Sequence, residues 1–274
     1  MLPVRLMCRA VGVSRSGYYA SRVRPESQRA RENRCLTVTA RAIWDESRKT
    51  YGSLRIHAEL RARGIRCSRN RVVRLMRTAG IRAAMRRRYR HTADSRHDYP
   101  VAPNRLKRSF LVDVRDRVWA TDTTCIWTES GWLHLAVVLD LHSRRVVGLA
   151  LSGRNDGELT AGALEMALGR RRPQAGLLHH SDRGSQYACF RYQRLLREHG
   201  LVPSMSRKGN PYDNAVVESF FKALKVELIY RRRFVSREEA TAAVVEYIES
   251  FYNCRRRHSA LGYLSPAEYE AVRQ

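Results

Sequence analysis

Two aspartates stand out because of the segments that surround them. Asp122 lies in VWATDTTCIW, a run of β-branched and aromatic residues that predicts a strand, although aspartate is rare inside strands. Asp182 follows AGLLHHS, at the end of a second predicted strand. Taken singly, the first is typical of an edge strand or a turn, and the second is typical of a helix cap. Together they favour a site at the tips of strands in an α/β sheet.

Two strand aspartates supply only part of a metal site for phosphate chemistry. Mg²⁺ ions need several oxygen ligands that converge from separate elements, so a third carboxylate is expected from a nearby helix. The segment NPYDNAVVESFFKALK offers two candidates, Asp213 and Glu218. Five helical positions place these two side chains about 140° apart, so they cannot both face one site.

The surroundings of Asp213 and Glu218 differ. If Asn210 caps the helix and Pro211 is its first residue, Asp213 lies in the first turn, where the helix dipole favours a carboxylate. Glu218 lies deeper, among valine and phenylalanine residues, where a carboxylate needs a partner or a metal ion. Lys225 is about 20° from the same face and could contact a phosphate beside the metal. We therefore expect a structural Asp213 and a metal-binding Glu218.

The elements that must position these residues follow an α/β order. Three strands are predicted from residue 118 to about residue 152, followed by a helix over ELTAGALEMALGRR and the strand that ends at Asp182. A helix that ends at Gly200, a short strand over LVPSM, and helices from about 211 to 230 and from Ser236 to about Tyr252 complete the order. This order predicts a mixed sheet with helices packed on it.

The charge of the chain is concentrated in its first part. The 274 residues contain 52 Lys and Arg and 26 Asp and Glu, a net charge of +26. Residues 1–110 alone hold 28 basic and 7 acidic residues. Such an excess indicates a polyanionic partner, most often nucleic acid, because binding to phosphates releases counterions. A ribosome-like or membrane-surface binder is the alternative.

Two helix-turn-helix patterns occur in this basic part. The first spans LMCRAVGVSRSGYYA, with Ser14 as the cap of its second helix. The second joins SLRIHAELRARGI to RNRVVRLMRTAG, with Ser68 as a cap and Gly80 as the end. Its second helix carries four arginines, which are Arg69, Arg71, Arg74 and Arg77. A basic second helix is typical of a helix that docks in a DNA groove, and a helical hairpin with a solvated basic face is the alternative.

These patterns divide the chain into three regions. Residues 1–81 are predicted to form a helical DNA-binding region, residues 82–110 a basic linker, and residues 111–274 a catalytic core with a basic C-terminal tail. No apolar run is long enough to span a bilayer, and the basic start is unlike a signal peptide, so we expect a cytoplasmic protein. The six cysteines have no metal-finger spacing and are expected to be reduced thiols.

Other residues near the acids suggest lesser roles. His179 and His180 are successive strand residues, so at most one of them faces a metal site. Arg183 is expected to shape the turn after Asp182 for a phosphate. The arginines of residues 255–257 indicate either contacts with the DNA backbone or a solvated tail. Three tryptophans are expected to pack against the sheet, namely Trp119, Trp127 and Trp132.

Several strings of the sequence resemble one known family. Asp122, Asp182 and Glu218 match the D-D-E triad of the retroviral-integrase-like core, with 35 residues between the second and third acids. HHSDRGSQY, SMSRKGNPYDNAVVESFF and YNCRRRHSALGYLSPAEY closely resemble the OrfB transposase of the IS-three family of bacterial insertion sequences. GVSRSGYY and YGSLRIHAELRARGI resemble the helix-turn-helix segments of the same family. The resemblance covers nearly the whole chain.

The resemblance implies a fold and a reaction. It implies an RNase H-like α/β catalytic core that follows the helical region. It also implies metal-dependent DNA cleavage and strand transfer, in which water and then a 3′-hydroxyl attack phosphodiesters in line. Asp122, Asp182 and Glu218 would hold two Mg²⁺ ions, or Mn²⁺ in their place, and Lys225 and Arg183 would contact DNA.

The resemblance also implies partners and leaves alternatives. The expected partners are transposon-end and target DNA, further copies of the chain on that DNA, and an upstream helix-turn-helix protein, fused or separate. The protein would act at the bacterial nucleoid. One alternative is a transposase-derived DNA-binding protein that no longer cuts, and another is an RNase H-like nuclease without strand transfer.

Overall fold

The computed structural model describes residues 3–83, 100–207 and 211–273 and divides the chain into two compact units, Met1–Ala83 and Ala84–Gln274. The described part of the first unit contains helices and no strand, whereas the second contains a five-stranded sheet. No described helix is long and apolar enough to cross a lipid bilayer.

The first unit contains both predicted helix-turn-helix patterns. Ser14 and Ser68 accept hydrogen bonds from the main chain at the start of their helices, as the sequence predicts. The sequence patterns do not predict the 19-residue helix that lies between the two helix-turn-helix pairs. Only three side chains of this helix are buried. The helices are α1 (Val4–Ala10), α2 (Arg15–Val23), α3 (Gln28–Glu46), α4 (Ser53–Ala62) and α5 (Arg69–Thr78).

Five strands form the sheet of the second unit in the order β3-β2-β1-β4-β5. The first three form an antiparallel meander, and β4 and β5 run parallel to β1, so the sheet is mixed, as the sequence predicts. The strands are β1 (Val118–Thr128), β2 (Gly131–Asp140), β3 (Val146–Ser152), β4 (Leu178–Ser181) and β5 (Val202–Met205).

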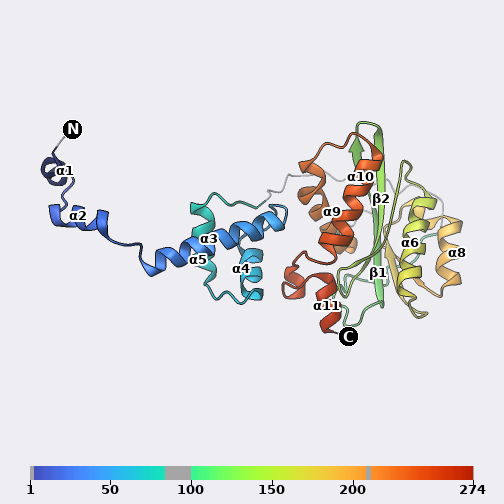
Figure 1. The fold of residues 1–274 in the computed structure, drawn as a ribbon. Helices are drawn as coiled ribbons and strands as arrows, with labels where there is room; N and C mark the ends of the chain where they lie inside the picture. The colour runs from blue at the N-terminus through green and yellow to red at the C-terminus, as the bar shows by residue number, and fades with distance from the viewer. Residues whose placement is uncertain (1–2, 84–99, 208–210, 274) are drawn as a thin grey trace. The chain divides into compact units, whose positions relative to one another are not determined.

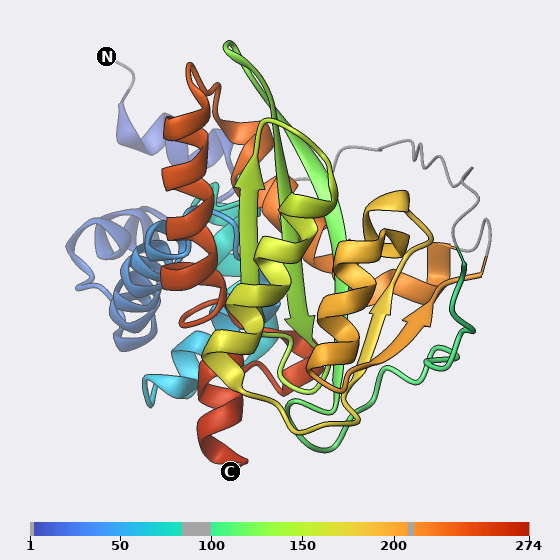
Figure 2. The same cartoon turned by 90° about the vertical axis from the view of Figure 1, so that its right-hand side faces the viewer.

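Helices cover both faces of this sheet (Figures 1 and 2). One face carries α6 (Gly157–Arg171), α7 (Ser185–Ala188) and α8 (Phe190–Glu198), and the other carries α9 (Ala215–Glu227) and α10 (Arg237–Glu246). The predicted helix of residues 185–200 is broken at Cys189, whose extended backbone ends α7 and begins α8. A π-helix over Tyr247–Tyr252 continues α10, and α11 spans Pro266–Val272.

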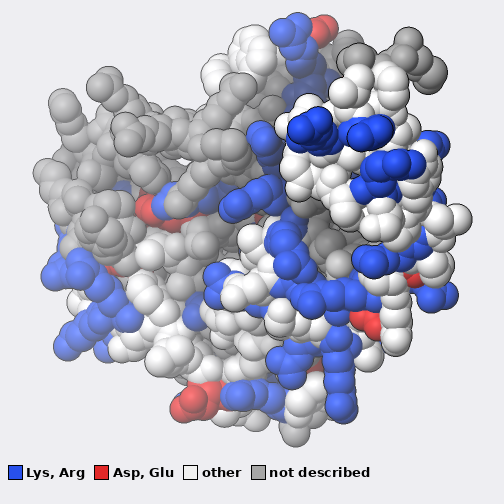
Figure 3. Space-filling model, turned by 90° about the vertical axis from the view of Figure 1, so that its left-hand side faces the viewer, with Lys and Arg blue, Asp and Glu red and all other residues white. Residues whose placement is uncertain are grey.

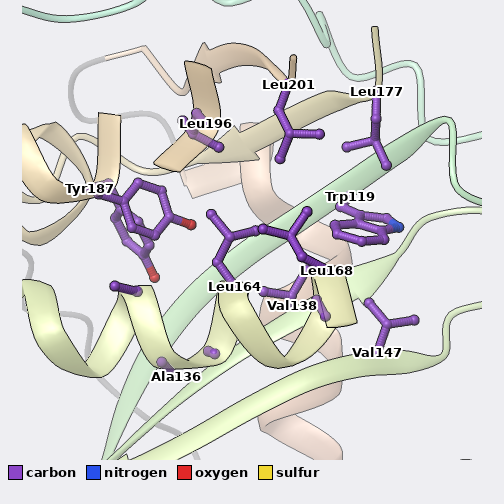
Figure 4. Close-up of a cluster of buried hydrophobic side chains, with 14 of the residues drawn as sticks. Trp119, Ala136, Val138, Val147, Leu164, Leu168, Leu177, Tyr187, Leu196 and Leu201 are labelled. Carbon is purple, nitrogen blue, oxygen red and sulfur yellow. The ribbon is translucent and has the colours of Figure 1, made fainter. Parts of the chain in front are cut away.

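A cluster of buried hydrophobic side chains lies between the sheet and helices α6 and α8 (Figure 4). Burial of each large side chain there contributes roughly 1.5–3 kcal/mol. Helix α6 lies so close to β3 that a Cβ atom on Gly148 would meet the main-chain oxygen of Ala163 at 2.1 Å. A glycine at this position therefore sets the spacing between helix and sheet.

Part of the predicted linker contacts the second unit. The main-chain nitrogens of Arg105 and Leu106 donate hydrogen bonds to Ser204 Oγ over 2.9 and 3.3 Å, and Leu106 is buried. These contacts place this segment against β5 rather than in a free linker. Residues 84–99 of the predicted linker lie outside the described residues.

Candidate catalytic site

The parallel pairing of β1 and β4 brings the two strand aspartates to equivalent positions. The last paired residues are Ala120 and His180. Asp122 and Asp182 each lie two residues beyond this pair, Asp122 still within β1 and Asp182 directly after the end of β4. Both side chains are half-buried. Neighbouring parallel strands are about 4.8 Å apart, so this register places the two carboxyl groups on adjacent chain segments.

Helix α9 brings the third acid toward β1. The helix contacts β1, and Asn214, which precedes it, donates a hydrogen bond from Nδ2 to the main-chain oxygen of Thr121 over 3.0 Å. Glu218 follows one turn later, half-buried, with Lys222 Nζ at 3.5 Å from its Oε2 atom. The strand residue before Asp122 is therefore linked directly to the start of the helix that carries Glu218.

The electrostatics of Asp122 show that the acids share one environment. Burial raises the pKa of Asp122 well above its ordinary value, and the negative charges of Asp182 and Glu218 raise it further. A hydrogen bond from the main-chain nitrogen of Thr123 and the positive charge of Lys225 oppose this rise. The three acids and the lysine identified in the sequence therefore act on one another electrostatically.

This environment suits a divalent cation. Among the residues that the structure describes, no three His, Cys, Asp or Glu side chains are gathered closely enough to form a ready-made metal site. The donors are nevertheless hard carboxylate oxygens, which Mg²⁺ and Mn²⁺ prefer, and a cation would offset the mutual repulsion that raises the pKa of Asp122. The chemistry of the donors therefore fits a divalent ion.

Lys225 lies on the same side of α9 as Glu218. Its side chain is half-buried, and burial lowers its pKa, whereas Cys125 and Asp122 act in the opposite direction. The position agrees with the helical geometry from which the sequence placed it near Glu218. A partly desolvated ammonium group beside the acids is suited to a phosphate contact.

Asp213 has a different role from the capping role that the sequence predicts. It lies in a 3₁₀ helix (Pro211–Asn214) before α9, is fully buried, and accepts hydrogen bonds from Arg108, Arg207 and Asn104. The arginines hold the pKa of Asp213 well below its usual range. Asn210, the predicted cap, lies outside the described residues. Asp213 therefore joins three chain segments through ion pairs and hydrogen bonds.

Neither histidine before Asp182 faces the acids. His179 Nε2 lies 2.6 Å from Tyr192 Oη, and His180 is hydrogen-bonded to Ser204 and Ser206. Burial lowers the pKa of His179 to about 3 and that of His180 to about 4, so both are neutral near pH 7. Both are structural residues.

Arg183 forms the turn after Asp182. Asp182 Oδ1 accepts a hydrogen bond from the main-chain nitrogen of Gly184 over 2.8 Å, and Arg183 Nε donates one to the main-chain oxygen of Ser206 over 2.6 Å. Arg183 thus ties the turn to the segment after β5, which is a structural contact beside its predicted one with DNA.

Two of the three arginines of residues 255–257 are buried, and the first is exposed. Arg256 is buried and forms a bidentate ion pair with Glu227, which also accepts a hydrogen bond from Tyr247 Oη over 2.8 Å. Arg257 is nearly buried and donates to the main-chain oxygen of Tyr263. The prediction of DNA-backbone contacts is therefore wrong for these two arginines, because their guanidinium groups are bound to a buried carboxylate and to a main-chain carbonyl.

The four arginines of α5 differ in exposure. Arg71 is ion-paired with Glu32 and hydrogen-bonded to Asn33, both on α3. The other three, which are Arg69, Arg74 and Arg77, are exposed. Basic side chains outnumber acidic ones on the described surface in Figure 3. Three of the four arginines are thus presented to solvent, whereas Arg71 holds α5 against α3.

The sequence did not reveal two residues that border the site. Asn214 is buried directly before α9, and its Oδ1 atom has no hydrogen-bond partner among the described residues. Tyr187 is fully buried, and its pKa is raised by burial and then by the charges of Asp122 and Asp182. The polar string PYDNA at the start of the predicted helix could have drawn attention to Asn214. No residue near Tyr187 in the sequence distinguishes this tyrosine from an ordinary tyrosine of the core.

Comparison with known proteins identifies the family. The family model of the Integrase core domain matches residues 114–211, and a second family model with the same description matches residues 218–273. The family model of the HTH-like domain matches residues 30–89. A 31 kDa protein of insertion element IS600 from Shigella sonnei is 44% identical over 96% of this chain and 97% of its own length. The transposase InsF of insertion sequence IS3A from Escherichia coli is 42% identical over 97% of this chain and 93% of its own.

A retroviral integrase core is among the solved structures that the chain resembles. The catalytic core of BIV integrase is 21% identical, with a TM-score of 0.44, and the alignment covers 57% of this chain and 95% of that one. Integrase cores depend on a divalent metal ion, and HTH-like domains bind DNA. The mixed sheet, one acid within β1 and another directly after β4, and the match to InsF along the chain lead to one conclusion: the chain belongs to the IS3 family of insertion-sequence transposases, enzymes with an RNase H-like integrase core.

Proposed function

We propose that Asp122, Asp182 and Glu218 are the catalytic carboxylates of this transposase. The observation that carries this assignment is the placement of the three acids around β1: Asp122 lies in it, Asp182 follows the parallel strand β4, and α9 brings Glu218 toward it. The hydrogen bond from Asn214 to β1 supports it, and so does the raised pKa of Asp122, whose causes include burial and the charges of both other acids.

The three carboxylates would hold two Mg²⁺ ions, or Mn²⁺ in their place. When bound, such ions supply Lewis-acid activation of the attacking oxygen and neutralise charge at the phosphate. Tyr187 and the sheet exclude water behind the aspartates, and Lys225 binds a phosphate beside the reacting one. Arg183 shapes the turn on which Asp182 lies and contacts DNA nearby.

The reaction consists of two successive displacements at phosphorus. In cleavage, a water oxygen forms a bond to phosphorus, and the 3′-oxygen of the transposon end leaves and takes up a proton. In strand transfer, that 3′-hydroxyl loses its proton and attacks a target phosphodiester, and the 3′-oxygen of the target strand leaves. Each displacement exchanges one P–O bond for another, so no covalent enzyme intermediate is required.

DNA binding is assigned to the first region. Residues 1–81 would recognise transposon ends, with Arg69, Arg74 and Arg77 of α5 at the DNA and Arg71 supporting the helix. Residues 111–274 would form the catalytic core. Several copies of the chain would assemble on transposon-end and target DNA at the nucleoid, together with an upstream helix-turn-helix protein, fused or separate.

A cleavage and joining assay tests this proposal. The substrate is duplex DNA that carries the terminal repeat of the element, with Mg²⁺, and both nicked and joined products are measured. We expect Glu218→Gln to lower both by at least about a hundredfold. Asp113→Asn removes an exposed acid of the same unit and is expected to retain full activity. If Glu218→Gln cuts as well as the wild type, the assignment falls.

The same assay separates the alternatives. A DNA-binding protein without catalytic activity would retain end binding and give neither product. A nuclease without strand transfer would give nicks but no joined strands. Joined products that depend on Glu218 are expected only from the proposed transposase reaction.

A further inference from the structure

A pocket with a volume of about 520 Å³ lies beyond the catalytic acids, at the tip of the β1–β2 hairpin. Its walls come from the end of β1, the start of β2, Lys225 of α9 and the segment of residues 229–234. The volume falls within the range of roughly 300–1,000 Å³ that is common for small-molecule sites. Lys225 borders both this pocket and the acids, so the two sites are adjacent.

Two tryptophans line the pocket with exposed indole rings. Trp127 is 57% exposed and Trp132 is 49% exposed, and their ring centroids are 4.9 Å apart in an edge-to-face arrangement. The sequence predicts that both pack against the sheet, but only Trp119 is fully buried. Large indole faces exposed in a concave site are suited to stacking against a flat ligand.

The charge of the pocket favours an anionic ligand. Lys225, Arg232 and Arg233 line it, and Glu129 is the acidic residue among the lining residues. Arg232 and Arg233 are exposed. Three cations against one acid leave the lining positive. Aromatic faces next to cationic side chains are the combination with which proteins bind single-stranded nucleic acid, because bases stack while phosphates pair with the cations.

We infer that this pocket binds an unstacked nucleobase of the DNA strand at the catalytic site. The base lies against Trp127 and Trp132, and the neighbouring phosphates contact Arg232 and Arg233. This inference rests on the proposed function, since the strand reaches the pocket past Lys225. It deepens that function by assigning a site for an unpaired nucleotide beside the reacting phosphate.

A binding measurement in EDTA tests the inference without catalysis. The probes are fluorescein-labelled single-stranded dT12 and a 12-base-pair duplex. We expect Trp127→Ala to weaken dT12 binding by about tenfold and to change duplex binding by less than about twofold. Trp127→Phe retains an aromatic face and should restore most of the lost affinity. Phe190→Ala removes another exposed aromatic side chain of the same unit and should have no effect.

Several outcomes would overturn the inference. Equal weakening of dT12 and duplex binding by Trp127→Ala would indicate a general DNA surface. Binding of dTMP as tight as that of dT12 would indicate a free-nucleotide site, and equal binding of a twelve-residue polyglutamate would indicate an acidic-peptide site. The two experiments are independent, because binding in EDTA involves no cleavage. A negative binding result for Trp127→Ala would leave the cleavage result for Glu218→Gln unaffected, and a negative cleavage result would leave the binding result unaffected.

Discussion

Asn214 donates a hydrogen bond from Nδ2 to the main-chain oxygen of Thr121 over 3.0 Å, and this contact joins the start of α9 to the residue before Asp122. The bond is buried, and the other side-chain atom, Oδ1, has no hydrogen-bond partner among the described residues. A single side chain thus fixes the helix that carries Glu218 relative to the strand that carries Asp122.

Asn214→Ala is expected to lower cleavage by about tenfold, which corresponds to about 1.4 kcal/mol, the size of one buried hydrogen bond. Because the acids lose their relative position, the Mg²⁺ concentration for half-maximal cleavage should rise as well. A Mg²⁺ titration of cleavage measures both effects. Ser219→Ala, at an exposed position of α9, serves as the control. An unchanged Mg²⁺ dependence would indicate that Asn214 affects stability alone.

Asp122→Asn is expected to stabilise the metal-free protein. The folded state raises the pKa of Asp122, so its ionisation lowers the free energy of unfolding as pH rises above the unfolded value of about 4. The substitution should therefore raise Tm near pH 7 by a few degrees and leave Tm near pH 4 almost unchanged; about 1 kcal/mol corresponds to roughly 2–4 °C. Thermal denaturation in EDTA at the two pH values measures this. Added Mn²⁺ should raise the Tm of the wild type more than that of the variant, and the reverse order would contradict the metal assignment.

Asp213→Asn is expected to cost about 1–3 kcal/mol of stability, because Arg108 and Arg207 lose a buried charged acceptor. The folded-state pKa of Asp213 is lowered, so its contribution is present above about pH 4 and is lost as pH falls further. Urea denaturation at several pH values should show the difference between wild type and variant shrinking below pH 4. The exposed Asp113→Asn should lie within about 0.5 kcal/mol of the wild type. A loss that does not depend on pH would exclude an electrostatic role.

Arg256→Met is expected to cost about 3–5 kcal/mol, because it leaves Glu227 charged and buried. The double variant Glu227→Gln/Arg256→Met should be more stable than this single variant. Urea denaturation of both single variants and the double variant measures the coupling. Arg255→Ala, at the exposed neighbouring position, should be almost neutral. Additive losses would show that the ion pair is unimportant.

Arg74→Ala and Arg71→Ala are expected to act differently on the DNA-binding region. Arg74 is exposed, so its loss should weaken DNA binding and reduce the slope of log K against log salt concentration by about 1, at constant Tm. Arg71 pairs with α3, so its loss should also lower the Tm. Salt titrations of duplex binding and thermal denaturation compare the two. Equal Tm values for both variants would contradict the supporting role of Arg71.

Much of the fold could be predicted because its signals are local. Alternation of apolar residues predicts the strands, serines such as Ser68 cap their helices, and the sheet class follows from the order of elements. The predicted angle of about 140° between Asp213 and Glu218 assumes one α-helix, but Asp213 lies in the 3₁₀ helix before α9. The break at Cys189 was missed because the apolar spacing continues across it.

The contacts that the sequence could not predict join distant parts of the chain. Glu227 and Arg256 are 29 positions apart, and Arg108 reaches Asp213 across 105 positions. Nothing in the local pattern of an arginine distinguishes one that pairs with a buried acid from one that is solvated. The exposure of Trp127 and Trp132 depends in the same way on where the residue 229–234 segment lies.

The pairing between β1 and β4 ends at Ala120 and His180, two residues before each aspartate. Beyond this pair β1 stays paired with β2, where Asp122 lies opposite Val137, whereas β4 ends at Ser181. Asp122 is therefore held by the sheet, whereas Asp182 belongs to the turn that follows β4, so a change in this turn alters the gap between the two carboxylates and leaves the sheet paired.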